Sequence, residues 1–409
     1  MKHNLLIITI LCINIIQLKA QADIEKRLQT QLIMVENGSK VEITEGVFSI
    51  SKSLSLEGKK NVIIKGQGMG KTILSFKNQT SGAEGIKITN CENITLEDLT
   101  VQDSKGDLIK TMHVKGMTFR RVKAEWTGKP KETNGSYALY PVQCEDVLID
   151  SCTAIGASDA GIYVGQSKNI EVKNCLAFQN VAGIEIENSL YADVHHNVAT
   201  GNTGGILIFD LPDLVQKKGG HIRVFDNIIK ENNLPNFAPK GNIVAQVPDG
   251  TGMTVLATNN VEIFNNQIIN NKTSGIGIIS YFMTEIKIKD TAYYPYPTAI
   301  DIHDNVFERR NERATKKGRM GKMYMFKLKF GKNVPHIMYD GIVDKNTLDA
   351  NGQVKPDSRI CIRNNKNQTM VNIDAGNGFK NINRDEKPFD CTLKKWFRIA
   401  ELQFRIAIH

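Results

Sequence analysis

Short apolar strands recur along the middle of the chain with a spacing of 22 residues. Three such units begin at Ala160, Ala182 and Gly204, and each carries aliphatic residues at alternate positions, such as Ile162 and Val164. Alternation over three to five residues, ended by Gly, Asn or Asp, is typical of β-strands and not of helices. Self-similarity at this period predicts a solenoid, because each unit buries its apolar face only by stacking on its neighbours.

Aligning the second short strand of each unit extends the repeat in both directions. The alignment produces an inward column of Leu96, Phe119, Ile149, Val172, Val194, Val224, Ile263 and Ile302. A second column, three residues later, comprises Leu99, Val122, Cys152, Cys175, Asn197, Asn227, Asn266 and Asn305, and a third comprises Asn180, Asn202, Asn232 and Asn271. Stacked asparagines can hydrogen-bond along the axis of such a coil, and asparagine also tolerates the left-handed backbone of a sharp corner.

These columns predict an all-β, single-stranded parallel β-helix of about 22 residues per coil. A β-sandwich with accidental similarity would not preserve three columns over this length. Longer steps in the repeat indicate corner insertions at residues 211–220, 235–250 and 281–297. We therefore expect an N-terminal cap and first coil at 23–80, the β-helix at 81–319, and a basic segment with a C-terminal cap at 320–409. The mixed apolar and basic end of the chain, from Leu393, is expected to cover the open end of the coil.

The N-terminus has the pattern of a signal peptide over residues 1–22. An apolar stretch at 5–18 follows Lys2 and His3, and Ala20-Gln21-Ala22 offers a small-x-small cleavage site. The stretch is too short and too interrupted to span a membrane. This predicts a secreted, periplasmic or cell-surface location without a transmembrane segment.

The cysteines show no metal-site spacing. Cys152 and Cys175 fall in the same stacked column on adjacent coils, where both side chains point the same way, so buried free thiols are favoured over a disulfide. Cys361 and Cys391 lie beyond the clearest repeats and are candidates for a disulfide in an exported chain.

The positive charge is concentrated in one segment. Residues 309–332 contain ten Lys or Arg and one acidic residue, Glu312, a balance of +9 that equals the formal charge of the whole chain. Such a segment is either a solvated excursion or a surface for an anionic polymer or membrane. Nucleic acid is the least favoured partner, because the segment lacks the interleaved aromatic residues that stack on bases.

A first candidate site lies on the outward face of the second strands. Glu171, Lys173, Asp193, His195 and Arg223 are expected to form a grid on three adjacent coils, about 5 Å apart between coils. Proton abstraction beside a uronate carboxylate needs a cation to neutralise the carboxylate, a base and an acid. Lys173 or His195 would serve as the base and Arg223 as the neutralising cation. The alternative is a set of surface ion pairs without a function.

A second candidate site, for substrate binding, lies on the first strands. Tyr163, Glu185, Glu187 and Asp210 point outward there, and an insertion begins directly after Asp210. Strand geometry places Glu185 and Glu187 about 7 Å apart on one face, within the range of carboxylate pairs that cleave glycosidic bonds. Asp159 precedes this face. The alternative is a polar outer strand that holds water or Ca²⁺; the sequence otherwise indicates no cofactor and no metal ligands.

The middle of the chain resembles bacterial exported right-handed parallel β-helix repeat proteins. The strings that carry the resemblance are Tyr-Pro-Val-Gln-Cys at 140, Gly-Ala-Ser-Asp-Ala-Gly-Ile-Tyr-Val-Gly-Gln-Ser at 156, Asn-Val-Ala-Gly-Ile-Glu-Ile-Glu-Asn-Ser at 180 and Asn-Phe-Ala-Pro-Lys-Gly-Asn at 236. This class includes pectate lyases, polygalacturonases and mannuronan epimerases, so the resemblance implies a right-handed coil with a polysaccharide groove.

The enzyme motifs of that class are weak or missing. Mannuronan epimerases carry Asp-Pro-His-Asp, whereas the nearest string here is Asp301-Ile302-His303-Asp304, which lacks the proline, so the catalytic role is not carried over. The Asp clusters of polygalacturonases have no matching string.

Two hypotheses follow for the function. The first is an exported enzyme that acts on an acidic polysaccharide as a uronate lyase or epimerase. The second is a non-catalytic glycan-binding or cell-surface protein. The oligomeric state stays open.

Overall fold

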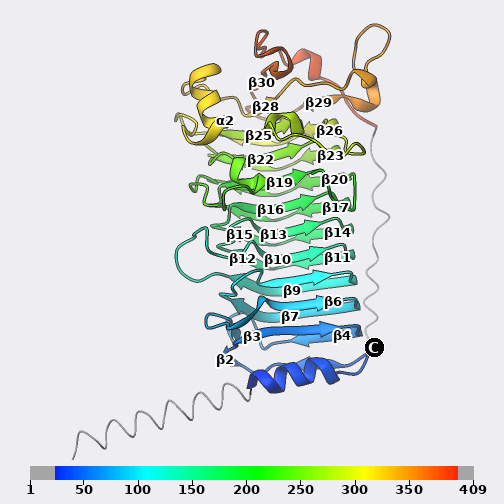
Figure 1. Ribbon diagram of the computed structural model, residues 1–409. Helices are drawn as coiled ribbons and strands as arrows, with labels where there is room; N and C mark the ends of the chain where they lie inside the picture. Colours follow the sequence, from blue (N-terminus) through cyan, green and yellow to red (C-terminus); the bar gives the residue numbers. More distant parts are fainter. Residues whose placement is uncertain (1–23, 395–409) are drawn as a thin grey trace, which may run out of the picture.

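The computed structural model describes residues 24–394, and within them the chain winds into one stack of β coils (Figure 1). Strands pair in parallel with their counterparts one coil earlier and one coil later, and they form two long sheets. This arrangement confirms the predicted all-β parallel β-helix. We call the sheets A and B.

Sheet B has 11 strands. They are β3 (Lys52–Glu57), β6 (Ser81–Thr89), β8 (Ile109–Met112), β10 (Tyr137–Val142), β13 (Ala160–Gly165), β16 (Ala182–Glu187), β19 (Gly204–Phe209), β22 (Thr251–Leu256), β25 (Ser274–Ile279), β28 (Ile337–Tyr339) and β30 (Met370–Asn372).

Sheet A has 19 strands, because most coils contribute two strands to it on either side of a corner. They are β1 (Lys40–Glu42), β2 (Gly46–Ser49), β4 (Lys60–Lys65), β5 (Thr72–Ser75), β7 (Glu92–Gln102), β9 (Lys115–Glu125), β11 (Glu145–Asp150), β12 (Thr153–Ile155), β14 (Lys168–Lys173), β15 (Leu176–Phe178), β17 (Leu190–His195), β18 (Val198–Thr200), β20 (Gly220–Phe225), β21 (Ile228–Lys230), β23 (Asn259–Phe264), β24 (Gln267–Ile269), β26 (Thr298–His303), β27 (Val306–Glu308) and β29 (Ile360–Arg363).

The inward column has the register that the sequence predicts. Backbone pairing aligns each residue of the column with the next, from Leu96 through to Ile302. Pairing also continues the column to Ile64 at one end and to Ile362 at the other. The stack of paired strands therefore extends on both sides of residues 81–319.

Two ladders of buried asparagines run along the stack. The side-chain amide of each donates to Oδ1 of the next, from Asn197 through Asn227 and Asn266 to Asn305 at 2.9–3.0 Å, and from Asn180 through Asn202 and Asn232 to Asn271 at 2.9–3.1 Å. The ladders satisfy polar groups inside the coil, where an unpaired amide would be costly.

The expectation that these asparagines adopt the left-handed conformation is wrong. The residue before each one makes the turn, for example His196 (φ 55°) before Asn197 and Gln179 (φ 58°) before Asn180. Because the side chain of a ladder asparagine points inward, the preceding residue, whose side chain points outward, adopts the left-handed conformation of the tight turn.

The repeated glycine of the first strands is explained by close packing between coils. A Cβ atom on Gly183 would lie 2.5 Å from the carbonyl oxygen of Gly205 and 2.9 Å from the amide nitrogen of Asn202. No side chain fits there without moving backbone, so the repeat retains glycine at this position.

The cysteines follow the interpretation of the sequence. Cys152 and Cys175 are buried free thiols, and Cys361 and Cys391 form a disulfide.

The two ends of the described stack are built differently. Residues 24–34 are helical and lie beneath the first coil (Figure 1), with Leu28 and Leu32 buried in the main core. Near the other end, part of the basic segment forms α2 (Gly318–Lys322), and Met320 and Tyr324 pack with Met338 in a separate apolar cluster on the outer face of sheet B. The predicted signal peptide and the chain after residue 394 lie outside the described residues. Between residues 24 and 394, no helix has both the length and the apolar character that a membrane crossing requires.

The large insertions leave the coil at the two edges of sheet B. Residues 210–219 and 280–297 follow β19 and β25 at one edge, and residues 231–250 and 309–336 precede β22 and β28 at the other. The outer face of sheet B is thereby flanked on both sides in the second half of the stack.

Candidate active site

The structure brings the first candidate set together on the outer face of sheet A. Register aligns Glu171 with Asp193 and Arg223 on β14, β17 and β20, and aligns Lys173 with His195. Lys173 Nζ lies 2.9 Å from Glu171 Oε1, and His195 Nε2 lies 3.2 Å from the same oxygen. The grid therefore exists as predicted in position.

Every member of this grid has an oppositely charged or hydrogen-bonding partner. Arg223 holds both carboxylate oxygens of Asp193, with Nε 2.7 Å from Oδ1. The hydrogen bonds from His195 and Lys173 lower the pKa of Glu171 to about 2 against the opposing effect of burial. Lys173, one of the two candidate bases, is engaged with Glu171. The geometry favours the interpretation as surface ion pairs, and the catalytic assignment of these five residues stays a prediction.

Aromatic rings form a stack beside this grid. His195 stacks on Phe225 at 4.7 Å between ring centroids, Phe225 on Phe264 at 4.9 Å, and Phe264 on His303 at 5.3 Å. The rings face one another along the coil axis, so the stack mainly covers the outer surface of sheet A.

The second candidate set lies on the outer face of sheet B. There the register places Lys87, Lys110 and Tyr140 in line and continues through Tyr163 to Glu185. Beyond Glu185 the column becomes Leu207, Thr254, Gly277 and Met338. The outer face thus changes from cationic to aromatic, then acidic, then mostly apolar along the stack.

The flanking insertions cover the acidic part of this face. An apolar cluster joins Tyr163 and Leu207 of the strands to Val244 and Val247 of one insertion and Tyr293 of the other. As a result, Glu185 is 1% exposed, Glu187 7% and Asp210 2%. Three carboxyl groups predicted to face outward are therefore enclosed by the protein's own loops.

Asp159 joins these carboxyl groups and is 6% exposed. Burial together with the charge of Glu187 raises the pKa of Asp159 to about 8. Burial raises the pKa of Glu187 and of Asp210 to about 7, and burial with the charges of Asp159 and Glu187 raises that of Glu185 well above its usual value. Buried carboxyl groups near one another resist ionisation, because each charge is poorly solvated and repelled.

Hydrogen bonds distinguish the members of this buried acidic cluster, by which we mean Asp159, Glu185, Glu187 and Asp210. Tyr163 donates its hydroxyl to Glu187 at 2.6 Å, and the backbone N–H of Gly219 donates to Asp210 at 2.8 Å. Oε2 of Glu185 and Oδ1 of Asp210 are buried without a hydrogen-bond partner. Clusters of titratable groups with shifted pKa values are typical of functional sites.

Sequence reasoning noted Asp159 only as a neighbour of this face and missed two residues that contact it. The hydroxyl of Tyr137 lies 3.5 Å from Asp159 Oδ2, and the amide of Asn242, from the insertion, lies 3.4 Å from the same oxygen. Tyr137 sits one coil before Asp159, so the repeat itself offered a signal. Asn242 lies in an irregular loop, where the repeat predicts no position.

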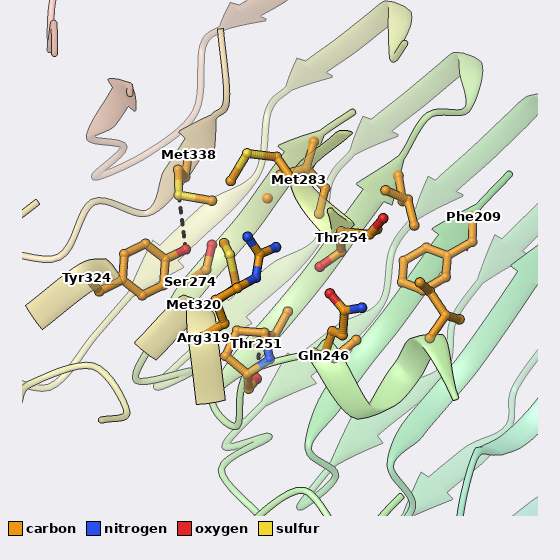
Figure 2. Close-up of a pocket in the computed structure, with 17 residues that line it drawn as sticks. Phe209, Gln246, Thr251, Thr254, Ser274, Met283, Arg319, Met320, Tyr324 and Met338 are labelled. Atoms are coloured by element: carbon orange, nitrogen blue, oxygen red, sulfur yellow. Dashed lines mark hydrogen bonds between the residues drawn. The ribbon is translucent and has the colours of Figure 1, made fainter. Parts of the chain in front are cut away.

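An apolar cavity of about 60 Å³ lies further along the outer face of sheet B. Figure 2 shows its lining, in which Met283, Met320 and Met338 come from different segments and the Tyr324 hydroxyl donates to the Met338 sulfur at 3.0 Å. Arg319, at its edge, pairs with Glu285 at 2.6 Å and so joins the insertions on opposite edges. The residues that line the cavity include no carboxyl groups, so it does not extend the acidic cluster.

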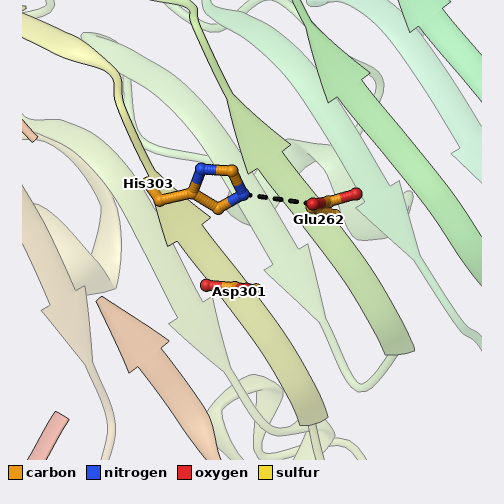
Figure 3. A group of neighbouring side chains, drawn as sticks. All are labelled: Glu262, Asp301 and His303. Carbon is orange, nitrogen blue, oxygen red and sulfur yellow. Dashed lines mark hydrogen bonds and ion pairs between the residues drawn. The ribbon is translucent and has the colours of Figure 1, made fainter. Parts of the chain in front are cut away.

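A separate group on sheet A has the composition of metal ligands. Glu262, Asp301 and His303 each offer one ligand atom, and these atoms lie within 4.8 Å of one another (Figure 3). The group lies on β23 and β26, away from the buried acidic cluster on sheet B.

Comparison with known families matches residues 29–219 and 132–291 to the family described as right handed beta helix region. Among curated proteins, the pre-neck appendage protein of Bacillus phage B103 is 24% identical over 209 residues, which cover 42% of this chain and 24% of that protein. The corresponding protein of Bacillus phage phi29 is 24% identical over 210 residues, with the same coverage. The chain therefore matches about a quarter of the length of these relatives.

Solved structures with a similar coil share little sequence with this chain. The A-module of a mannuronan C-5 epimerase from Azotobacter vinelandii aligns over 78% of this chain and 89% of its own, with 13% identity and a TM-score of 0.49. An exopolygalacturonase from Thermotoga maritima aligns over 78% and 81%, with 12% identity and a TM-score of 0.47.

Proposed function

Since the chain belongs to the right-handed β-helix family, we propose that its sheet B face binds an acidic polysaccharide and cleaves a glycosidic bond with Glu185 and Glu187. One observation carries the proposal. Two carboxyl groups on alternate residues of β16 are enclosed by insertions, and Oε2 of Glu185 has no hydrogen-bond partner. A buried, unsatisfied carboxyl group is costly to a fold, which supports a role for it in chemistry.

The environments of the two glutamates assign their roles. Glu185 has no donor to stabilise its anion, so it stays protonated and acts as the general acid. Glu187 accepts a hydrogen bond from Tyr163, which favours its carboxylate, so it acts as the base for water. Alternate residues of one strand have backbone positions about 7 Å apart, which allows their carboxyl groups a separation within the range of inverting glycosidases.

The outer face of β6, β8 and β10, which the insertions leave uncovered, has side chains that favour an acidic substrate. Lys87 and Lys110 are adjacent in its outer column, and the Lys110 ammonium lies 5.0 Å from the centre of the Tyr140 ring. Cations followed by an aromatic face suit a chain of acidic sugars, whose carboxylates pair with lysine and whose apolar faces pack on rings.

Access to the buried acidic cluster requires the insertion at 235–250 to move. Asn242 of that loop contacts Asp159, and Val244 is fully buried against sheet B. Displacement of this loop would join the cluster to the open outer face. The predicted signal peptide supports an exported protein that acts on an extracellular glycan.

The test is a panel of uronate-containing and neutral polysaccharides incubated with the full chain. New reducing ends report hydrolysis, and absorbance of an unsaturated product reports elimination. We expect reducing ends without that absorbance, and a loss of about 10²-fold or more in Glu185→Gln and Glu187→Gln. Glu308→Gln, an exposed glutamate at the end of β27, is the matched control.

Other outcomes contradict the proposal in distinct ways. Unsaturated products would support the lyase hypothesis of the sequence. Glycan binding without any product, at high protein concentration, would support the non-catalytic hypothesis.

A further inference from the structure

Glu262, Asp301 and His303 form a compact set of potential ligands on the outer face of sheet A. Register pairs Glu262 with Asp301 across β23 and β26, and His303 follows Asp301 by two residues on the same side of β26. Figure 3 shows the three side chains grouped over these strands, and one ligand atom from each lies within 4.8 Å of the others.

The second observation is an unsatisfied oxygen within this group. Asp301 is 4% exposed, and its Oδ1 has no hydrogen-bond partner. Arg363 Nη2 holds the other oxygen, Oδ2, at 3.0 Å. The guanidinium thus anchors the carboxylate and leaves one oxygen available to a ligand.

His303 is oriented as a metal-binding histidine requires. Its Nδ1 lies 2.7 Å from Oδ2 of Asp304, and its Nε2 lies 3.1 Å from Glu262. In metal sites, a ligating histidine commonly donates its second N–H to a carboxylate, which fixes the tautomer and makes the ligating nitrogen more basic. Asp304 occupies that place here, at the left-handed corner directly after the strand.

The same chain contains a second Glu-Asp-His set in equivalent register, which serves as an internal comparison. Glu171, Asp193 and His195 occupy the positions of Glu262, Asp301 and His303 on earlier coils. In that set, the Lys173 ammonium pairs with the Glu171 carboxylate, and Arg223 donates to both carboxylate oxygens of Asp193. His196 occupies the position equivalent to that of Asp304, and its Nδ1 lies 2.7 Å from Nδ1 of His195. That set is saturated by cations and lacks the supporting carboxylate.

We propose that Glu262, Asp301 Oδ1 and His303 Nε2 bind a divalent transition-metal ion of the zinc class, with Asp304 orienting His303. Two carboxylate oxygens and one imidazole nitrogen suit such an ion, whereas Ca²⁺ prefers oxygen ligands alone. Binding replaces the hydrogen bond between His303 and Glu262 and releases any proton held on Nε2. The ion would link adjacent coils near the C-terminal end of the stack.

The experiment is a calorimetric titration of the chelator-treated full chain with ZnCl₂. We expect wild type to bind one more equivalent than Asp301→Asn or His303→Ala. Asp304→Asn keeps every ligand and should bind that equivalent about 10- to 100-fold more weakly. Asp193→Asn and His195→Ala, at the equivalent positions, should bind as wild type does.

Co²⁺ serves as a spectroscopic probe of the same site. A visible d–d band that is present in wild type and in Asp193→Asn, and lost in Asp301→Asn, would support the assignment. Circular dichroism confirms that each variant is folded.

The proposal is overturned if Asp301→Asn and His303→Ala retain the full stoichiometry, or if the variants at Asp193 and His195 lose as much. Failure of wild type to bind Zn²⁺ or Co²⁺, or binding of Ca²⁺ alone, would also overturn it. None of these outcomes depends on glycan cleavage, so the test is independent of the proposed function.

Discussion

The outer faces of sheets A and B both carry neighbouring carboxylates, yet the pKa of Glu171 on sheet A and the pKa values of Glu185 and Glu187 on sheet B shift in opposite directions. On sheet A, Glu171 and Asp193 are partly exposed and paired with cations, and the pKa of Glu171 is lowered. On sheet B, Glu185 and Glu187 are buried without cationic partners in their hydrogen bonds, and the pKa of each is raised. The carboxylates lie on regular parallel strands in both sheets. The difference lies in the side chains that neighbour and cover them.

The difference comes from what covers each face. Lysine, arginine and histidine at neighbouring register positions neutralise Glu171 and Asp193 on sheet A, and both carboxylates remain partly accessible to water. Insertions fold over sheet B and replace water with apolar and aromatic side chains. A β-helix offers many outward carboxylates, so a covering loop is what converts an ordinary surface position into a buried acid.

The largest expected effect concerns activity. If sheet B holds the chemistry, Glu187→Gln should lower the rate of glycan cleavage by about 10²- to 10⁴-fold. Glu171→Gln, on sheet A, should change it less than twofold. Rates of reducing-end formation measure both, and a larger loss in Glu171→Gln would reverse the comparison and restore the first candidate site.

The next effect is on stability at alkaline pH. The pKa of Asp159 rises from 3.8 to about 8 on folding, so the folded state holds the proton more tightly than the unfolded state. Its contribution is fully present below about pH 4 and is lost as the pH rises towards 8. Asp159→Asn should therefore stabilise the protein by about 1–3 kcal/mol at pH 8 and change little at pH 4.

Thermal unfolding at a series of pH values measures this difference. An advantage of Asp159→Asn that does not grow with pH would show that the carboxyl group is ionised in the folded protein.

A substitution on sheet A should change the stability in the opposite direction and by a smaller amount. The pKa of Glu171 falls from 4.5 to about 2 on folding, so its contribution is present above about pH 4.5 and is lost as the pH falls towards 2. Glu171→Gln should destabilise the protein by about 1 kcal/mol or less at pH 7, because the pair is partly solvated. Chemical denaturation at pH 7 and pH 3 tests this, and an equal loss at both values would contradict it.

The smallest effect sharpens the roles within sheet B. Tyr163→Phe removes the hydrogen bond that stabilises the Glu187 carboxylate, so the pKa of Glu187 should rise further. The acidic limb of the pH–rate profile should then shift to higher pH, with little change in stability. A profile that does not move would mean that Glu187 is not the base.

Much of the coil followed from the repeat alone. The inward column from Leu96 to Ile302 is confirmed residue by residue, because stacked parallel strands place equivalent residues at equivalent positions. The ladder from Asn197 to Asn305 is confirmed for the same reason. The turn conformation of the ladder residues was predicted wrongly, since composition does not show whether an asparagine turns the chain or points inward.

The candidate sites were predicted less completely. The repeat correctly assembled Glu185 with Glu187 and Glu171 with Lys173, because each pair lies within regular strands. It did not show that Asn242 contacts Asp159, since that contact joins residues 83 positions apart through an irregular loop. It also did not show that Asp301 is buried with one oxygen held by Arg363, because Arg363 lies in a segment where the periodicity fades.

The sequence by itself determined the coil, its register and the face on which each outward side chain lies. The reason is physical: parallel stacking with alternating side chains leaves few other ways to bury these aliphatic columns. Only the tertiary structure decided which outward carboxyl groups are solvated and paired and which are enclosed, with raised pKa values. That state depends on where long insertions settle and on which charges they bring, and neither is periodic.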